Sequence, residues 1–138
     1  MSAENVELAR RLWERVIEGG RTGRVDMALS EPGWDADLEY VEDPNWPGAG
    51  TYRGLEAVRA RFEEYMEIFG ATDITLEEIL DAGDQLVCIF RTEGKSAQSG
   101  LPFEHEWAWI WRFREGQVVA MRAYFHTDEA LEAAGLQA

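Results

Sequence analysis

The segment from Phe103 to Phe113 has an alternation that suits a β-strand and little else. Its odd-numbered positions carry five aromatic residues and a histidine: Phe103, His105, Trp107, Trp109, Trp111 and Phe113. The positions between them are Glu104, Glu106, Ala108, Ile110 and Arg112. Successive side chains of a strand point to opposite faces of the sheet, so one face of this strand is aromatic. Because each buried ring removes ~150–250 Å² from water, we expect that face to point inward, where it either fills a core or walls a pocket for an apolar molecule.

The remaining patterns place helices and strands around this segment. Apolar residues at helical spacing predict helices over 3–18, 24–29 and 55–69, with the pair Gly19-Gly20 ending the first. Strands are predicted over 35–43, 72–80, 85–95, 103–113 and 118–126, with a loop over 44–54 and a short tail helix over 127–134. This order predicts one α+β domain over 1–138, in which three helices of the N-terminal half pack on a curled, mostly antiparallel sheet.

The net charge of the chain limits the classes of partner that it can bind. Thirteen basic residues stand against 27 acidic ones, which leaves a formal net charge of −14. Such a surface repels phosphate backbones and anionic membranes, so we expect neither nucleic acid nor membrane as a partner. No apolar stretch has the length of a signal sequence or a membrane span, and a cytoplasmic protein is expected.

Metal and cofactor chemistry also has little support in the sequence. The single cysteine, Cys88, lies in an apolar run and is expected to be a small core residue. The two histidines, His105 and His126, lie far apart along the chain. Neither shows the spacing of a metal site, so we expect no metal and no cofactor.

The outward face of the predicted sheet has an apolar centre with charge at its rim. Ala108 and Ile110 would lie there beside Val87 and Ile89 of the preceding strand. An apolar patch with a polar rim is typical of a protein interface. We therefore predict a homodimer that forms through the outer sheet face.

The stretch YVEDP, residues 40–44, carries the strongest local signal for chemistry. Glu42 and Asp43 are adjacent, so in a strand they would point to opposite faces and only one could face inward. If that residue is Asp43, burial among tryptophans would raise its pKa and make it a general base. The alternative is a solvated carboxylate in the turn before Pro44.

Several motifs together carry a family resemblance over about residues 5–128. VEDP, the helix YRGLEAVRARFEEY, the hairpin WRFREGQVVA and the final MRAYF resemble the nuclear transport factor 2-like superfamily, in its branch of ketosteroid isomerases and SnoaL-like polyketide cyclases. The resemblance implies a cone-shaped α+β barrel that encloses a pocket and is commonly dimeric through the outer sheet face. It matches Asp43 to the proton-shuttling aspartate of the isomerase. The two oxyanion donors of that enzyme fall near Trp13 and Trp109, where only indole N–H groups could donate.

These observations define the candidate site. Asp43 and His105 are the candidate catalytic residues, although a histidine at position 105 could instead be a core residue bonded to the backbone. The candidate substrate-binding residues are Trp13, Tyr40, Trp46, Phe90, Trp107, Trp109, Trp111, Met121 and Phe125.

Three functions agree with this site. The first is an isomerase, cyclase or dehydratase that uses Asp43 as general base on a small apolar carbonyl compound. The second is a non-catalytic binder of a small apolar ligand. The third is an association domain whose cavity is filled by its own side chains.

Overall fold

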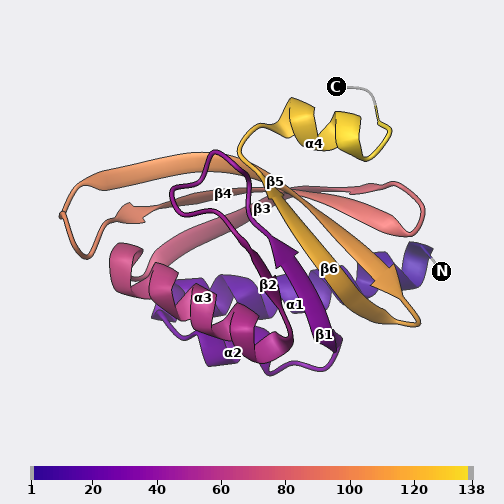
Figure 1. Ribbon diagram of the computed structural model, residues 1–138, viewed down its shortest axis with the longest axis horizontal. Helices are drawn as coiled ribbons and strands as arrows, with labels where there is room; N and C mark the ends of the chain where they lie inside the picture. The colour runs from indigo at the N-terminus through magenta and orange to yellow at the C-terminus, as the bar shows by residue number, and fades with distance from the viewer. Residues whose placement is uncertain (1, 137–138) are drawn as a thin grey trace.

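A curled six-stranded sheet with helices on both faces makes up the fold (Figure 1). The computed structural model describes residues 2–136. The helices are α1 (Ser2–Thr22), α2 (Val25–Leu29), α3 (Leu55–Phe69) and α4 (Thr127–Ala133), and the strands are β1 (Trp34–Val41), β2 (Thr51–Arg53), β3 (Thr72–Asp81), β4 (Gln85–Lys95), β5 (Pro102–Arg114) and β6 (Gln117–Tyr124). None of these helices is long and apolar enough to cross a membrane.

The strand order is β2-β1-β6-β5-β4-β3, and only the β1–β6 pair is parallel. This confirms the predicted α+β fold with a curled, mostly antiparallel sheet and its meander of four strands. Within residues 2–136 the sheet stays open, because β2 and β3 are its two edges.

The aromatic face of β5 points inward, as predicted. Trp111 lies between Leu86 of β4 and Met121 of β6, and its side chain is only 1% exposed. Its ring stacks on Trp13 of α1, with centroids 5.1 Å apart and planes 7° from parallel. The tryptophans of β5 therefore pack the sheet against the helices.

The pair Gly19-Gly20 does not end the first helix, and this prediction was wrong. The helix α1 runs through both glycines to Thr22. A Cβ atom at Gly19 would lie 2.7 Å from the carbonyl oxygen of Arg24, and one at Gly20 would lie 3.0 Å from that of Thr72. The glycines are thus needed because α2 and β3 approach the helix closely at this point.

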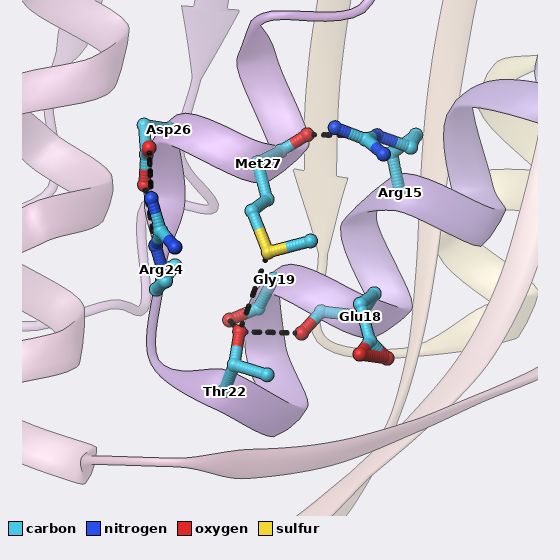
Figure 2. A network of polar contacts seen from close by, with 7 residues as sticks. All are labelled: Arg15, Glu18, Gly19, Thr22, Arg24, Asp26 and Met27. Carbon is cyan, nitrogen blue, oxygen red and sulfur yellow. Dashed lines mark hydrogen bonds and ion pairs between the residues drawn. The ribbon is translucent and has the colours of Figure 1, made fainter.

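Polar contacts hold the turn between α1 and α2 (Figure 2). Nε of Arg15 donates to the carbonyl oxygen of Met27 at 3.3 Å, and Oγ1 of Thr22 donates to that of Glu18 at 2.8 Å. The Arg15 contact keeps α2 beside α1, where both helices border the inner face of the sheet.

The outer face of the sheet is covered by the chain itself. Figure 1 shows α4 on the side of the sheet opposite α1 and α3. There Ala130 of α4 is fully buried in one cluster with Val87, Ile89, Ala108 and Ile110. The apolar centre that suggested a second copy is therefore occupied by the C-terminal helix, and the homodimer stays a prediction.

The end of β1 differs from the prediction in a way that shapes the site. The strand ends at Val41, so Glu42 and Asp43 follow it and are not bound by strand alternation. Both side chains are buried, each 3% exposed, which corrects the expectation that only one could face inward. The predicted loop 44–54 contains the short strand β2, whose Thr51 pairs with Val41 and so returns the chain to the end of β1.

Candidate active site

A cavity of about 410 Å³ lies against the inner face of the sheet. This is near the lower end of the ~300–1,000 Å³ range of small-molecule pockets. All predicted site residues line it: Trp13, Tyr40, Asp43, Trp46, Phe90, His105, Trp107, Trp109, Trp111, Met121 and Phe125.

The carboxylate of Asp43 is buried and held by three N–H donors. Its Oδ2 accepts a hydrogen bond from the backbone N–H of Phe125 at 2.9 Å. Its Oδ1 accepts from the backbone N–H of Asn45 at 2.8 Å and from Nδ2 of the same residue at 3.1 Å. A carboxylate offers about four acceptor positions, so roughly one remains for a ligand. The alternative of a solvated turn residue is thereby excluded.

The side chain of His105 also binds the backbone of Phe125. Its Nε2 lies 2.9 Å from the carbonyl oxygen of that residue. Because a carbonyl can only accept, Nε2 is the donor, and in the neutral ring Nδ1 then has the lone pair. Within residues 2–136 this Nδ1 has no hydrogen-bond partner, so it can accept a proton from a ligand.

A buried polar network lies beside Asp43, and sequence reasoning missed it. Glu42 accepts from Nε and Nη2 of Arg61 at 2.8 and 3.1 Å, from the N–H of Gly50 at 3.1 Å, and from the hydroxyl of Tyr65. Because that hydroxyl donates to a carboxylate, the oxygen of Tyr65 accepts from the hydroxyl of Tyr40, 2.9 Å away. The only advance signal was that Arg61 and Tyr65 are four residues apart on one face of α3.

This network holds its members in single protonation states. The hydrogen bond to Glu42 raises the pKa of the Arg61 guanidinium, which stays charged. Burial and the hydrogen bond to Glu42 raise the pKa of the Tyr65 phenol, and burial raises that of Tyr40, so both stay neutral. The negative charge of Glu42 is thus balanced by Arg61, whereas no ion pair joins Asp43 to a cation among residues 2–136.

Trp46 closes the aromatic wall from the loop after β1. Its ring lies 5.7 to 5.9 Å from those of Tyr65, Phe69, Trp107 and Phe125. These four rings come from α3, from β5 and from the chain just after β6. One loop side chain therefore bridges the helix and the sheet at the cavity.

The indole N–H groups of the wall fall into two kinds. That of Trp107 donates to Oγ1 of Thr92 at 3.1 Å. Those of Trp13, Trp109 and Trp111 are buried without an acceptor of hydrogen-bond geometry in residues 2–136. The Trp13 indole lies beside the thiol of Cys88, a weak acceptor. Trp109 and Trp111 line the cavity, but their N–H groups are buried in the packed wall.

The charged side chains that line the cavity among the described residues are two carboxylates, Glu42 and Asp43. Residues 2–136 contain no group of three or more His, Cys, Asp or Glu side chains placed to hold a metal ion. The chemistry that these side chains themselves offer is proton transfer at Asp43 and His105, inside a predominantly aromatic cavity.

Comparison with known proteins gives a family and several structural neighbours. Residues 13–121 match the model of the SnoaL-like domain. No curated protein matches the sequence. An NTF2-like protein of Anabaena variabilis has a TM-score of 0.76 and 22% identity, with 92% of each chain covered.

Two further neighbours were crystallised with small molecules. A protein of Catenulispora acidiphila with a ketosteroid isomerase-like fold, in complex with trimethylamine, has a TM-score of 0.69 and 17% identity, over 91% of this chain and 92% of that one. The protein TerC, co-crystallised with polyporic acid, has a TM-score of 0.72 and 20% identity, over 96% of this chain and 98% of that one. At these identities the likeness shows the fold alone.

Proposed function

Because the chain belongs to the SnoaL-like domain family, which includes cyclases and isomerases, we propose that it is an isomerase- or cyclase-like enzyme acting on a small apolar carbonyl compound. Asp43 is its general base. The observation that carries this proposal is the Asp43 carboxylate, which is buried at an aromatic cavity and makes no ion pair with the residues that the structure describes.

The proposed step is a proton transfer from carbon to oxygen. Asp43 takes the proton from the carbon next to the carbonyl group, and the C–H electron pair forms the enolate. Negative charge then develops on the ligand oxygen, where a hydrogen-bond donor would stabilise it. If the enolate is conjugated with a C=C bond, Asp43 returns the proton to the far carbon, which gives isomerisation. If the enolate carbon instead attacks a second carbonyl group, a C–C bond forms and Asp43 returns the proton to the resulting alkoxide, which gives cyclisation.

His105 has a second role in this proposal. Its Nε2–H is held by the carbonyl oxygen of Phe125, which orients the ring and leaves Nδ1 as an acceptor. Nδ1 would take a proton from a ligand hydroxyl or return one to the product.

The test is deuterium exchange at the acidic carbon of a model ketone, 2-tetralone, followed by NMR in D₂O. General-base catalysis contributes typically ~10²- to 10⁴-fold, so the Asp43→Asn variant should lose at least ~10²-fold of the exchange rate in the bound complex. Asp37→Asn, the same change at an exposed position of β1, is the matched control and should keep the full rate. Retained binding together with an unchanged exchange rate in Asp43→Asn would remove Asp43 as the base.

The second candidate is a non-catalytic binder of an apolar ligand. It is favoured by the three hydrogen bonds that already occupy Asp43 and by the dominance of rings in the wall. This function predicts tight binding of 2-tetralone by the wild-type protein, measured by tryptophan fluorescence, with no acceleration of its deuterium exchange.

A further inference from the structure

We propose that Thr92 and His105 together bind one hydroxyl group of the ligand at the inner face of the sheet. The hydroxyl of Thr92 donates a hydrogen bond to the ligand oxygen, and Nδ1 of His105 accepts one from the ligand O–H. This inference rests on the proposed function in one respect, namely that the cavity is the ligand site. The substrate class is then narrower than an apolar carbonyl compound: a flat ketone that also has a hydroxyl group.

Most polar side chains at the cavity already have their hydrogen bonds. The carboxylate of Glu42 accepts four of them, and that of Asp43 accepts three. The hydroxyls of Tyr40 and Tyr65 donate within the network of Glu42. A ligand therefore meets few free polar groups, and those few determine which polar substituents the cavity can bind.

The hydroxyl of Thr92 is one of these free groups. Its Oγ1 accepts from the indole N–H of Trp107 at 3.1 Å, but its own O–H donates to no group in residues 2–136. The bond from Trp107 orients the hydroxyl and polarises it, which makes it a better donor. The other threonine at the cavity, Thr72, has no such capacity, because its hydroxyl donates to the carbonyl oxygen of Gly70 at 3.0 Å.

Nδ1 of His105 is the complementary acceptor. The ring is fixed by the bond between its Nε2 and the carbonyl oxygen of Phe125, and Nδ1 has no partner in residues 2–136. This nitrogen is not among the buried side-chain atoms that lack a partner in that part of the chain, so it keeps accessible surface. A ligand can therefore reach Nδ1 without displacing a side chain.

The two groups lie next to each other on the sheet. Thr92 of β4 is directly opposite His105 of β5 in the antiparallel register, and such pairs have Cβ atoms ~4.5–5.5 Å apart on one face. Both side chains are half-buried and line the cavity. Because a hydroxyl oxygen lies ~2.8 Å from each hydrogen-bond partner, it can bridge two groups up to ~5.6 Å apart. One ligand hydroxyl can thus contact both residues.

This pair of groups selects a hydroxyl over other oxygen substituents. A hydroxyl both accepts and donates, whereas a ketone or an ether oxygen can accept from Thr92 but has no proton for His105. A carboxylate also lacks that proton, and the charged side chains that line the cavity among residues 2–136 are the carboxylates of Glu42 and Asp43. The substituent bound here is therefore an uncharged hydroxyl group.

The hydroxyl lies apart from the carbon that Asp43 deprotonates. Phe125 contacts both Asp43 and His105, whereas Thr92 is on β4, across β5 from the segment of Phe125. Neighbouring strands are ~4.8 Å apart, so Thr92 lies about two strand spacings, ~10 Å, from Phe125. The hydroxyl therefore belongs to the part of the ligand that is remote from its reacting carbon.

The test measures how much a hydroxyl group improves the binding of 2-tetralone. The probes are 2-tetralone, its isomers with a hydroxyl at carbon 5, 6, 7 or 8, and the corresponding methoxy compounds, with Kd measured by isothermal titration calorimetry. At least one hydroxy isomer should bind about 3- to 10-fold more tightly than both 2-tetralone and its methoxy counterpart. If no hydroxy isomer does so, the proposal is overturned.

Variants of Thr92 assign the donor. Thr92→Val keeps the shape of the side chain and removes the O–H, so the gain from the ligand hydroxyl should fall by about 3- to 10-fold. Thr92→Ser keeps the O–H and the acceptor for Trp107, and it should retain the gain. Thr72→Val is the matched control and should leave the gain unchanged, because the Thr72 hydroxyl is already bonded to Gly70. A full gain in Thr92→Val would show that Thr92 does not bind the hydroxyl.

A variant of His105 assigns the acceptor. His105→Phe keeps a flat ring and removes Nδ1, so the preference for the hydroxy isomer over its methoxy counterpart should fall by about 3- to 10-fold. The ratio of the two Kd values is the readout, because a general change in the wall affects both probes. A preference that persists in full would exclude His105 from the subsite.

These experiments measure equilibrium binding alone, and 2-tetralone itself has no hydroxyl group. Deuterium exchange at Asp43 can therefore fail while the preference for a hydroxyl is observed, or the reverse, so the two proposals are tested separately.

Discussion

Asp43 and His105 bind the backbone of the same residue, Phe125. Oδ2 of Asp43 accepts its N–H at 2.9 Å, and Nε2 of His105 donates to its carbonyl oxygen at 2.9 Å. The two candidate proton carriers come from the end of β1 and from β5, and they are joined through the segment that follows β6. The backbone of Phe125 therefore sets the position of Asp43 relative to His105.

The buried pair of Glu42 and Arg61 should dominate the local stability. Arg61→Met leaves a buried carboxylate without its cation and should lower the free energy of unfolding by about 3–5 kcal/mol. The double variant with Glu42→Gln removes both charges and should recover most of that loss. Urea unfolding measures both changes. Arg59→Met, which breaks a surface pair with Glu56, is the control, and an equal loss there would contradict the prediction.

The loop that carries Trp46 should act as the gate of the cavity. Hydrogen bonds hold its two ends, from Asn45 to Asp43 and from Gly50 to Glu42. Trp46→Ala should therefore raise both the association and the dissociation rate of 2-tetralone in stopped-flow fluorescence, with a smaller change in Kd. If only the dissociation rate rises, Trp46 contributes to binding but does not act as a gate. Pro47→Ala, at an exposed position of the same loop, should leave both rates unchanged.

Helix α4 should keep the outer sheet face from pairing with another molecule. Ala130→Glu places a charge in the cluster with Val87 and Ile110, so α4 should detach and expose that apolar patch. The variant should self-associate more strongly than the parent chain in size-exclusion chromatography with light scattering. Glu132→Ala, on the exposed side of α4, is the control. A variant that stays in the state of the parent chain would show that α4 does not limit this contact.

Cys88 should make the protein less stable in alkali. Burial raises the pKa of its thiol from 9.0 to about 12, so above pH 9 the unfolded chain binds fewer protons than the folded one. Stability should therefore fall as the pH rises from 9.0 to about 12, at up to ~1.4 kcal/mol per pH unit from this group. Cys88→Ala should have a shallower slope in urea unfolding across this range. Equal slopes would show that the thiol does not contribute.

Local patterns predicted much of the architecture. The alternation around Trp107 and Trp111 indicated an inward aromatic face, and helical spacing predicted α3, because strand and helix periodicities follow from backbone geometry alone. The same patterns misread Gly19-Gly20 as a helix end. Only the approach of the Arg24 and Thr72 carbonyl oxygens shows why glycine is favoured there.

The site depended more on distant contacts. The sequence indicated that Asp43 would lie near tryptophans, but it could not show that β1 ends at Val41 and so leaves Glu42 buried as well. Nor could it show which residues would neutralise Glu42, since Arg61 lies on another element and meets it only after folding.

Strand alternation identified the β5 residues of the aromatic wall in advance, because side-chain direction along a strand repeats every two residues. The hydrogen-bond partners of the polar groups at the cavity were set only when the chain folded. In the folded chain the Asp43 carboxylate accepts hydrogen bonds from Asn45 and Phe125, and Glu42 pairs with Arg61. The N–H groups of Trp109 and Trp111 have no acceptor in residues 2–136. Hydrogen bonds need partners within about 3 Å, and for most of these groups the partners come from segments that are remote along the chain.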